Sequence, residues 1–493
     1  MPAMQTVNSL VKATVTGTIW VYGTFLASKL LVFVTTLVLA RLLSPEDFGL
    51  LALAMMAVTA LDAFSDLGVG AALVQRRGDM DRATDVAFGI NIAMGAALAA
   101  VAALAAPPVA DFFGDPRTVP IMQALGLSFF INGLANIHIA RMRKEMDFRR
   151  RFLPEIIKAA VKGGAGIALA LAGFGVWSLV WAHLLGLAVG AAMYWTMTPW
   201  RPRLAFEPRL ARDLTGYGLH IVSIGLIGMA LKNVDFLMIG RLLDVTQLGF
   251  YTFAAMIPEL VVANTCYMVS QAVFPAYSKV QEDPDALRSG FLATMRYVAM
   301  LTVPASLGLA LIAADFMAVF YPSHWAPSVP VLQALAVSAL VASLGFNTGD
   351  VFKAVGRPSI LNLRNIAHLA LAVPLFWWAA GRGIATLAQT QAGLTAVVSV
   401  MTFALAVRFI RVSVGEILRA LEPALVAGAV MTLACLAAIQ GLDDASAALR
   451  LPATVAVGAT VYAAVLWGRY RALCAGVVAV FGRRTSTAGL NRL

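Results

Sequence analysis

The residues of this sequence best suited to chemistry are charged side chains that interrupt long apolar segments. Charge in hydrocarbon is costly, so such residues usually bind a substrate, carry ions or pair with one another. Lys29 lies 12 residues before Arg41, which corresponds to about 18 Å along a helix and to the middle of a bilayer. Two roles are open to Lys29: an ion pair that fixes a neighbouring helix, or a cation that lines a cavity for a polar substrate.

A second cation lies in the other half of the chain. Lys232 and Asp235 are one helical turn apart in the apolar segment 214–240. Lys232 could attract a diphosphate or an acidic sugar, whereas an internal pair with Asp235 would neutralise much of this attraction.

Further charged residues lie at intermediate depth. Lys162 is expected about 15 Å from the basic end of its helix and could enter the same cavity, as could Arg296, whereas Lys158 at about 9 Å could extend its amine to the membrane surface. Asp62 and Asp66 are four residues apart. Like Asp235, they are candidates for coupling to a proton or sodium gradient or for structural pairing, here with Lys29 or a neighbouring helix.

No arrangement of catalytic residues, zinc signature or nucleotide motif is present in the sequence, and the three cysteines lack metal-ligand spacing. The segment KGGAG at 162–166 follows no strand, so its glycines, like Gly186 and Gly190, are expected to allow close helix packing. The sequence therefore predicts no catalytic residue, no metal and no cofactor. Any driving energy should come from an ion gradient or from consumption of the substrate on the far side of the membrane.

The composition requires a lipid environment for the elements that carry these residues. Of 493 residues, 60% are hydrophobic and 13% are charged, and the mean hydropathy is +0.81. With about 20 residues for each span, the sequence predicts an all-α, polytopic membrane protein of about fourteen helices. These lie near 17–40, 45–74, 83–106, 118–140, 152–172, 175–196, 214–240, 245–275, 288–314, 328–349, 359–380, 383–407, 420–439 and 451–468.

The basic residues form short patches between the apolar segments, and every second loop is basic. A formal charge of +11 in this arrangement argues against a nucleic-acid partner, because no solvated domain is predicted. Lysine and arginine accumulate on the cytoplasmic side of membrane proteins. The alternation therefore places both termini in the cytoplasm.

An internal repeat divides the chain. Arg41, Leu42, Leu43 and Gly49 recur 200 positions later as Arg241, Leu242, Leu243 and Gly249, and the motif that begins at Pro120 and includes Gln123 reappears from Pro330 with Gln333. Six helices separate the first pair of motifs, so the halves are parallel repeats, a known transporter arrangement. We predict a six-helix lobe at 1–200, a second at 201–412, and two extra helices with a basic cytoplasmic tail at 413–493.

The repeated motif also predicts where helices begin. Ser44 is placed to cap a helix, Pro45 to occupy its first position, and Asp47 its third. Asp244 and Gln247 occupy the corresponding positions in the second copy.

Several of these segments also resemble a known family. LARLLSPEDFGLLALA at 39–54 and FSDLGVGAALVQRR at 64–77 closely resemble the start of polysaccharide transporters of the multidrug, oligosaccharidyl-lipid and polysaccharide exporter superfamily. LKNVDFLMIGRLL, SQAVFPAYSKVQ, WAPSVPVLQALAVSALVASLG and AVGRPS resemble the second half of the same proteins, so the resemblance covers nearly the whole chain.

The resemblance implies two six-helix lobes around a cavity that opens alternately to either side of a bacterial inner membrane. It further implies transfer of undecaprenyl-diphosphate-linked oligosaccharide units to the periplasmic face for exopolysaccharide or lipopolysaccharide biosynthesis. Cavity cations such as Lys29 and Lys232 fit this activity, and the last two helices could hold the lipid tail. A polysaccharide polymerase and a chain-length regulator are implied partners, beside the substrate and membrane lipids.

Three alternatives are open. An ion-coupled multidrug antiporter of the same superfamily would favour acidic residues in the cavity over lysines. A flippase of cell-wall lipid precursors would share the lobes. A membrane polysaccharide polymerase or ligase would carry a large outer catalytic loop, and the sequence has no loop longer than roughly 20 residues between its predicted helices.

Overall fold

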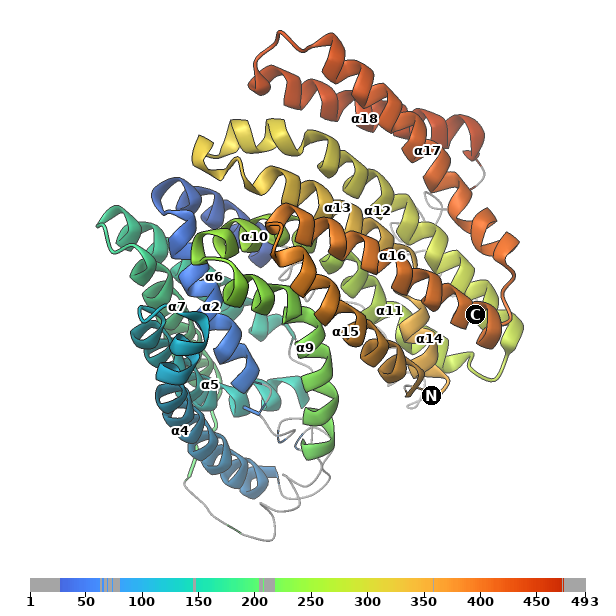
Figure 1. Ribbon diagram of the computed structural model, residues 1–493. Coiled ribbons are helices and arrows are strands. Elements are labelled where there is room, and N and C mark those ends of the chain that lie inside the picture. Colours follow the sequence, from blue (N-terminus) through green and yellow to red (C-terminus); the bar gives the residue numbers. More distant parts are fainter. Residues whose placement is uncertain are drawn as a thin grey trace. The chain divides into compact units, whose positions relative to one another are not determined.

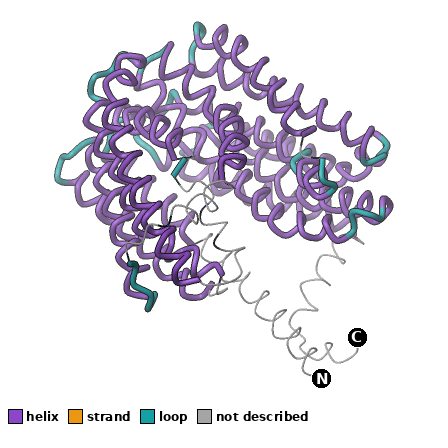
Figure 2. Tube along the Cα trace, turned by 90° about the horizontal axis from the view of Figure 1, so that it is seen from below, coloured by secondary structure: helices purple, strands orange, loops and turns teal. Residues whose placement is uncertain are grey.

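The structure is a computed structural model that describes residues 27–62, 80–144, 148–203 and 218–471 except Pro358, together with a few isolated positions. Every regular element within these residues is helical (Figure 2). The prediction of an all-α membrane protein with about fourteen helices is confirmed. Ten helices in the described ranges are long and apolar enough to cross a membrane.

The chain is organised into two compact units. Unit 1 comprises Met1–Phe253 and Phe376–Ile384, and unit 2 comprises Ala254–Leu375 and Ala385–Leu493. The helices of unit 1 are a helix over residues 27–42, α2 (Pro45–Asp62), α4 (Met80–Phe113), α5 (Thr118–Lys144), α6 (Phe148–Leu171), α7 (Val176–Met197), α9 (Gly218–Leu242) and most of α10 (Val245–Pro258).

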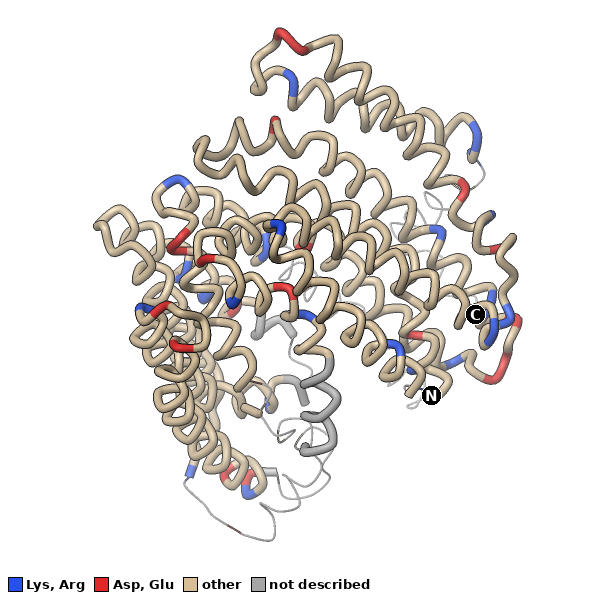
Figure 3. The backbone as a smooth tube through the Cα atoms, in the orientation of Figure 1, with Lys and Arg blue, Asp and Glu red and all other residues tan. Residues whose placement is uncertain are grey.

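Unit 2 contains the remaining helices. These are η1 (Glu259–Ala263), α11 (Asn264–Lys279), α12 (Pro284–Phe320), η2 (Ser323–Trp325), α13 (Ser328–Leu344), α14 (Thr348–Ala354), most of α15 (Ser359–Ala380), α16 (Ile384–Phe409), α17 (Val414–Gly441) and α18 (Ala447–Arg469). Figure 1 shows α17 and α18 side by side, next to α12. Charged residues of α17 and α18 lie toward the helix ends, and long stretches between them are uncharged (Figure 3).

Two predicted helices differ from the observed ones. The helix predicted over 45–74 is interrupted after Asp62, where Phe64 and Ser65 donate backbone hydrogen bonds to Leu61 and Asp62 in a turn. Val69 and Leu73 are helical again, and the other positions from 66 to 74 lie outside the described residues. The helix predicted over 245–275 is divided into α10, a π-helical turn (η1) and α11. Pro258 has no N–H to donate within the helix, and the backbone N–H of Asn264 bonds the carbonyl of Glu259, five residues earlier.

The predicted helix starts of the repeat are confirmed. The side chain of Asp47 accepts from the backbone N–H of Ser44 at 2.9 Å, and Ser44 Oγ accepts from the backbone N–H of Asp47 at 3.3 Å. In the second copy, Asp244 Oδ1 accepts from the backbone N–H of Gln247 at 2.7 Å. These bonds satisfy N–H groups that have no partner within their own helix.

A repeated side-chain contact supports the duplication. Gln123 on α5 donates to the carbonyl of Ala103 on α4 at 3.5 Å, and Gln333 on α13 donates to the carbonyl of Ala310 on α12 at 3.2 Å. Each bond therefore joins a motif helix to the helix that precedes it.

The repeated glycines meet at a crossing between α2 and α10 within unit 1. A Cβ atom at Gly49 would overlap the carbonyl oxygen of Val245, and one at Gly249 would overlap the carbonyl oxygen of Pro45. The backbones approach closely because neither residue has a side chain.

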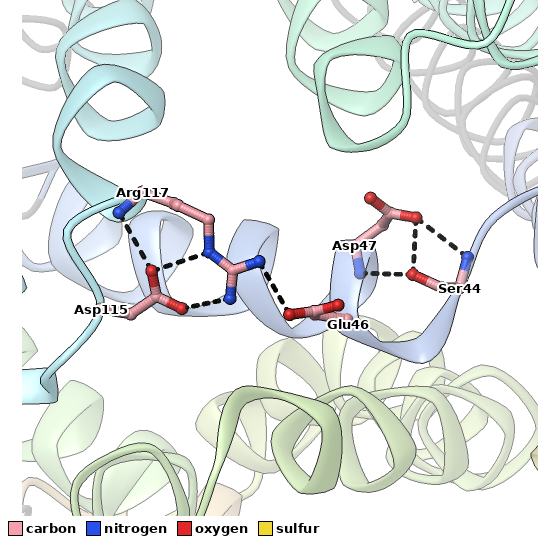
Figure 4. Close-up of polar contacts among 5 residues, drawn as sticks. All are labelled: Ser44, Glu46, Asp47, Asp115 and Arg117. Carbon is pink, nitrogen blue, oxygen red and sulfur yellow. Dashed lines mark hydrogen bonds and ion pairs between the residues drawn. The ribbon is translucent and has the colours of Figure 1, made fainter.

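The connection between α4 and α5 is held by charged hydrogen bonds (Figure 4). The buried carboxylate of Asp115 accepts from Arg117 Nη2 at 2.7 Å, from Nε at 3.0 Å and from the backbone N–H at 3.0 Å. Arg117 Nη1 also pairs with Glu46 in the first turn of α2 at 2.8 Å. The arginine hydrogen bond is the main reason that the pKa of Asp115 lies below its usual range.

This shift predicts a pH-dependent effect of Asp115→Asn. A carboxyl whose pKa is lower in the folded state stabilises the fold above its unfolded pKa of about 4, and this contribution disappears as pH falls through the folded pKa. The variant should therefore melt at a lower temperature at neutral pH. The loss in free energy of unfolding should be about 1 kcal/mol or less, because Arg117 is largely exposed. Melting temperatures of both proteins should converge in acid, and a difference independent of pH would contradict this account.

Candidate substrate-binding site

The candidate site in unit 1 is built on α6, which packs closely against two other helices. A Cβ at Gly163 would contact Thr35, and one at Gly166 would approach Leu39 and Ala182. On the facing side of α7, a Cβ at Gly186 would lie 3.0 Å from the carbonyl oxygen of Lys158. The expectation of close packing is confirmed for Gly163, Gly166 and Gly186, but is wrong for Gly164, where a Cβ would meet no atom within 4 Å. The close packing brings α6 against the helix over residues 27–42 and against α7.

This packing places two lysines and a histidine within electrostatic reach of Lys162. The side chain of Lys162 is exposed, yet surrounding protein atoms desolvate it, and the positive charges of Lys158 and Lys29 act on it. His183 on α7 is within the electrostatic reach of Lys162 and Lys158. Like charges repel, so such a group is held together by the helix packing and is suited to an anion with several negative oxygens.

Lys158 differs from Lys162 in having an acidic partner. Its amine lies 2.7 Å from Glu155 Oε2, and Tyr194 donates a hydrogen bond to Glu155 Oε1 at 2.8 Å. This network joins α6 to α7. Lys158 therefore has a structural pairing, and Lys162 presents its charge at an exposed position.

The two predicted residues on α9 have different surroundings. Lys232 is exposed, whereas Asp235 is buried and accepts a hydrogen bond from the Tyr251 hydroxyl at 2.7 Å. The backbone N–H of Phe236 also donates to Asp235, at 2.9 Å. Asp235 thus bonds α9 to α10, where Tyr251 is fully buried.

Of the two acidic candidates on the second predicted helix, the structure describes Asp62. Asp62 is the last residue of α2 and is exposed, so it is not buried within a continuous helix. Asp66 lies outside the described residues. The hydroxyl of Ser65 can compete with helical backbone bonds, which fits the turn that follows Asp62.

Arg296 is the predicted cation in unit 2. It lies on α12, is half-buried, and its Nε is buried without an acceptor among the described atoms. A guanidinium in this state has hydrogen-bonding capacity left for a ligand.

Three further ionisable residues in helices were not predicted as site residues from the sequence. His183 interrupts the apolar run of α7, and Glu259 is exposed on the π-helical turn. Arg364 is half-buried on α15 and bonds Asn365 Oδ1 at 2.9 Å. The rule that ionisable residues in apolar segments are functional candidates would have found His183 and Glu259. Arg364 is close to the start of its helix and gives no such signal.

Metal binding has no support in the described part of the chain, where no group of three or more His, Cys, Asp or Glu side chains could hold an ion. The charged groups of unit 1 are instead suited to binding phosphate oxygens.

Solved structures with a similar fold are membrane transporters. A structure of the lipid II flippase MurJ in an inward closed conformation aligns with a TM-score of 0.74 at 13% identity, over 92% of this chain and 99% of that chain. An inward-facing multidrug resistance transporter of the MATE family aligns with a TM-score of 0.66 at 16% identity, over 79% and 94% of the two chains. The fold is therefore that of a multi-pass transporter.

Sequence comparison defines the family more narrowly. Residues 38–330 match the model of a family described as polysaccharide biosynthesis protein, and the chain belongs to this family. It is 25% identical to the lipopolysaccharide biosynthesis protein WzxC of Escherichia coli (strain K12), over 74% of this chain and 75% of that protein. It is 26% identical to the succinoglycan biosynthesis transport protein ExoT of Rhizobium meliloti (strain 1021), over 72% and 69%. The resemblance found in the sequence is confirmed.

Proposed function

We propose that this protein is a flippase that moves polyprenyl-diphosphate-linked oligosaccharide units from the cytoplasmic to the periplasmic face of a bacterial inner membrane. The observation that carries this proposal is the exposed Lys162, grouped with Lys29 and Lys158 inside an apolar helix packing. A diphosphate offers several anionic oxygens to such a group. Family membership and the names of WzxC and ExoT support a role in polysaccharide biosynthesis.

The mechanism keeps each part of the substrate in a suitable environment. The lipid chain stays in hydrocarbon, and the sugars cross through a hydrated space, because bare hydroxyl groups in hydrocarbon would be costly. The cations hold the diphosphate while access alternates between the two sides. Lys29, Lys162 and Lys232 in unit 1 and Arg296 in unit 2 are the proposed substrate contacts. No bond is made or broken, so the protein acts as a transporter and not as an enzyme.

An apolar pocket in unit 2 is our candidate for the lipid chain. It has a volume of about 500 Å³ and lies among α12, α17, α18 and η1. Gly308, Cys435 and Ala459 are among its lining residues. The family resemblance implies that the last two helices could hold the lipid tail, and the apolar lining of this pocket supports that proposal.

Coupling to a proton or sodium gradient is part of the proposal. MATE transporters share the fold, and Glu259 adds an exposed carboxylate at the π-helical turn to the predicted candidates Asp62, Asp66 and Asp235. We further propose that both termini are cytoplasmic, that the lobes lie at 1–200 and 201–412 with the extra helices at 413–493, and that a polymerase and a chain-length regulator act with the protein.

The proposal is tested in liposomes that contain the purified full-length protein and a labelled polyprenyl-diphosphate oligosaccharide. Accessibility of the sugar to an added impermeant reagent is followed over time, with protein-free liposomes as the baseline and with imposed proton or sodium gradients. Transfer faster than the baseline supports the flippase. Transfer equal to the baseline under every gradient, together with export of a cationic dye, would assign the protein to multidrug antiport instead.

Filling the apolar pocket with a bulky side chain should slow transfer of substrates with long lipid chains and not of those with short chains. Gly308→Phe places a ring where a Cβ meets no atom within 4 Å. Each buried CH₂ contributes about 0.8 kcal/mol, so displacing two of them should lower transfer of a long-chain substrate about tenfold. A short-chain analogue should be transferred as by the unmodified protein.

The control is Gly393→Phe on α16, another position where a Cβ meets nothing within 4 Å and which does not line the pocket. It should affect neither substrate. An equal loss for both chain lengths in Gly308→Phe would refute the assignment of the pocket to the lipid chain.

A further inference from the structure

A second pocket in unit 2 is basic and is not explained by transport of the substrate. Its volume is about 440 Å³, and its lining includes Arg357, Arg408 and Arg411 together with Phe409 and Gln281. Arg357 lies in the connection between α14 and α15, Arg408 in the last turn of α16, and Arg411 in the connection between α16 and α17. All three side chains are exposed.

Local backbone structure directs two of these arginines. Gly356 has φ 71° at the end of α14, and the backbone N–H of Arg357 bonds the carbonyl of Phe352 at 2.8 Å, which closes the helix and turns the chain at Arg357. Arg411 itself has φ 58°, a left-handed conformation that disfavours residues with a Cβ. It is held there by Ile410 and Val412, which are both buried.

Two acidic groups near this pocket, Glu416 and Asp350, are engaged with other partners. Glu416 pairs with Arg288 and accepts hydrogen bonds from Ser413, and Asp350 lies 3.6 Å from Lys353. None of the three pocket arginines forms an ion pair with a carboxylate among the described residues. Their positive charge is therefore available to a ligand.

The position of the pocket relative to the membrane spans indicates the source of that ligand. One span ends at Phe409 and the next begins at Val414, so Arg408 and Arg411 lie where two helices leave the hydrocarbon. Beside them, Phe409, Val414 and Leu418 are exposed by 40%, 61% and 58%. Basic residues next to exposed apolar side chains at this depth match a phospholipid, whose phosphate and acyl chains are adjacent.

We propose that Arg357, Arg408 and Arg411 form a binding site for the phosphate of an anionic phospholipid. The guanidinium groups bind the phosphate oxygens, and the exposed apolar residues of α17 contact the acyl chains. Arg411, whose backbone is in the left-handed conformation, lines the pocket with the other two arginines.

The test measures binding of phosphatidylglycerol to the purified full-length protein in detergent by native mass spectrometry, with phosphatidylethanolamine as the zwitterionic comparison. Arg357→Gln/Arg408→Gln/Arg411→Gln should weaken phosphatidylglycerol binding at least about tenfold, since each charged hydrogen bond contributes to affinity. Binding of phosphatidylethanolamine should weaken less, because its ammonium group offsets the charge of its phosphate. Arg419→Gln is the matched control, an exposed arginine of α17 that does not line the pocket.

Arg411→Gly separates binding from folding. Glycine adopts positive φ without strain, so this variant should melt at a higher temperature and still bind less phosphatidylglycerol. Unchanged lipid binding in both the triple variant and Arg411→Gly would overturn the proposal. Thermal protection by inorganic phosphate or glycerol 3-phosphate equal to that by phosphatidylglycerol would also overturn it, and would assign the pocket to a soluble phosphate.

Discussion

Replacing Lys162 by glutamine should lower the initial rate of oligosaccharide transfer about tenfold to hundredfold. A hydrogen bond to a charged group contributes about 1.5–3 kcal/mol, and each 1.4 kcal/mol is a factor of ten. The melting temperature should stay the same or rise, because the substitution removes the repulsion of Lys162 by Lys158 and Lys29. Loss of transport without loss of stability is the signature expected of a binding residue.

Lys158→Gln should give the opposite pattern. Lys158 pairs with Glu155, which also accepts from Tyr194, so the substitution leaves a carboxylate without its cation. The melting temperature should fall, and transfer by the protein that remains folded should be reduced less than in Lys162→Gln.

Both variants are compared by the liposome assay and by thermal melting of the protein in detergent, after equal insertion has been verified. Lys162→Arg retains the charge and should keep most of the transport activity. If Lys162→Gln transfers the oligosaccharide at the wild-type rate, Lys162 does not contact the substrate. Lys29→Ala would then test whether another cation of the group has this role.

Local signals in the sequence predicted much of the fold. The helix caps at Ser44 and Asp244 were predictable because the capping side chain and its backbone partner are within three residues of each other. The matching bonds of Gln123 and Gln333 follow from a motif that occurs twice. The length of the apolar segments predicted the membrane spans. It did not predict the end of α2 at Asp62 or the π-helical turn at Glu259.

The site was less predictable because it depends on which helices meet. Lys29, Lys158 and Lys162 were each recognised as charged residues within or near a span, but the sequence does not say that they form one group. The Tyr251 partner of Asp235 is 16 positions away, and nothing in the spacing identifies it. A helix crossing between two copies of a repeat is likewise a tertiary contact, without a local signature.

The crossing at Gly49 should tolerate no side chain. In Gly49→Ala the new Cβ would overlap the carbonyl oxygen of Val245, which belongs to the backbone and cannot rotate away. Overpacking at such a contact costs about 1–3 kcal/mol, and Gly49→Val should cost more and reduce the amount of folded protein. Thermal melting measures this cost, and an unchanged melting temperature for Gly49→Ala would contradict the observed crossing.

Gly393→Ala on α16 provides the control, because a Cβ at that position meets no atom within 4 Å. Replacing an unconstrained helical glycine by alanine should stabilise the protein by about 0.4–1 kcal/mol. The two substitutions are chemically identical. They should have opposite effects on stability because the surroundings of Gly49 are crowded and those of Gly393 are open.

A double-mutant cycle tests whether Gly49 and Gly249 form one contact. A Cβ at Gly249 would also approach the backbone nitrogen of Gly49, so the first alanine at either position already forces α2 and α10 apart. The second alanine then meets a wider gap and should cost less than it does alone, giving an interaction energy of about 0.5–3 kcal/mol. Additive losses would mean that the two glycines act at separate contacts, and that the duplicated motif places them in similar helices without making them partners.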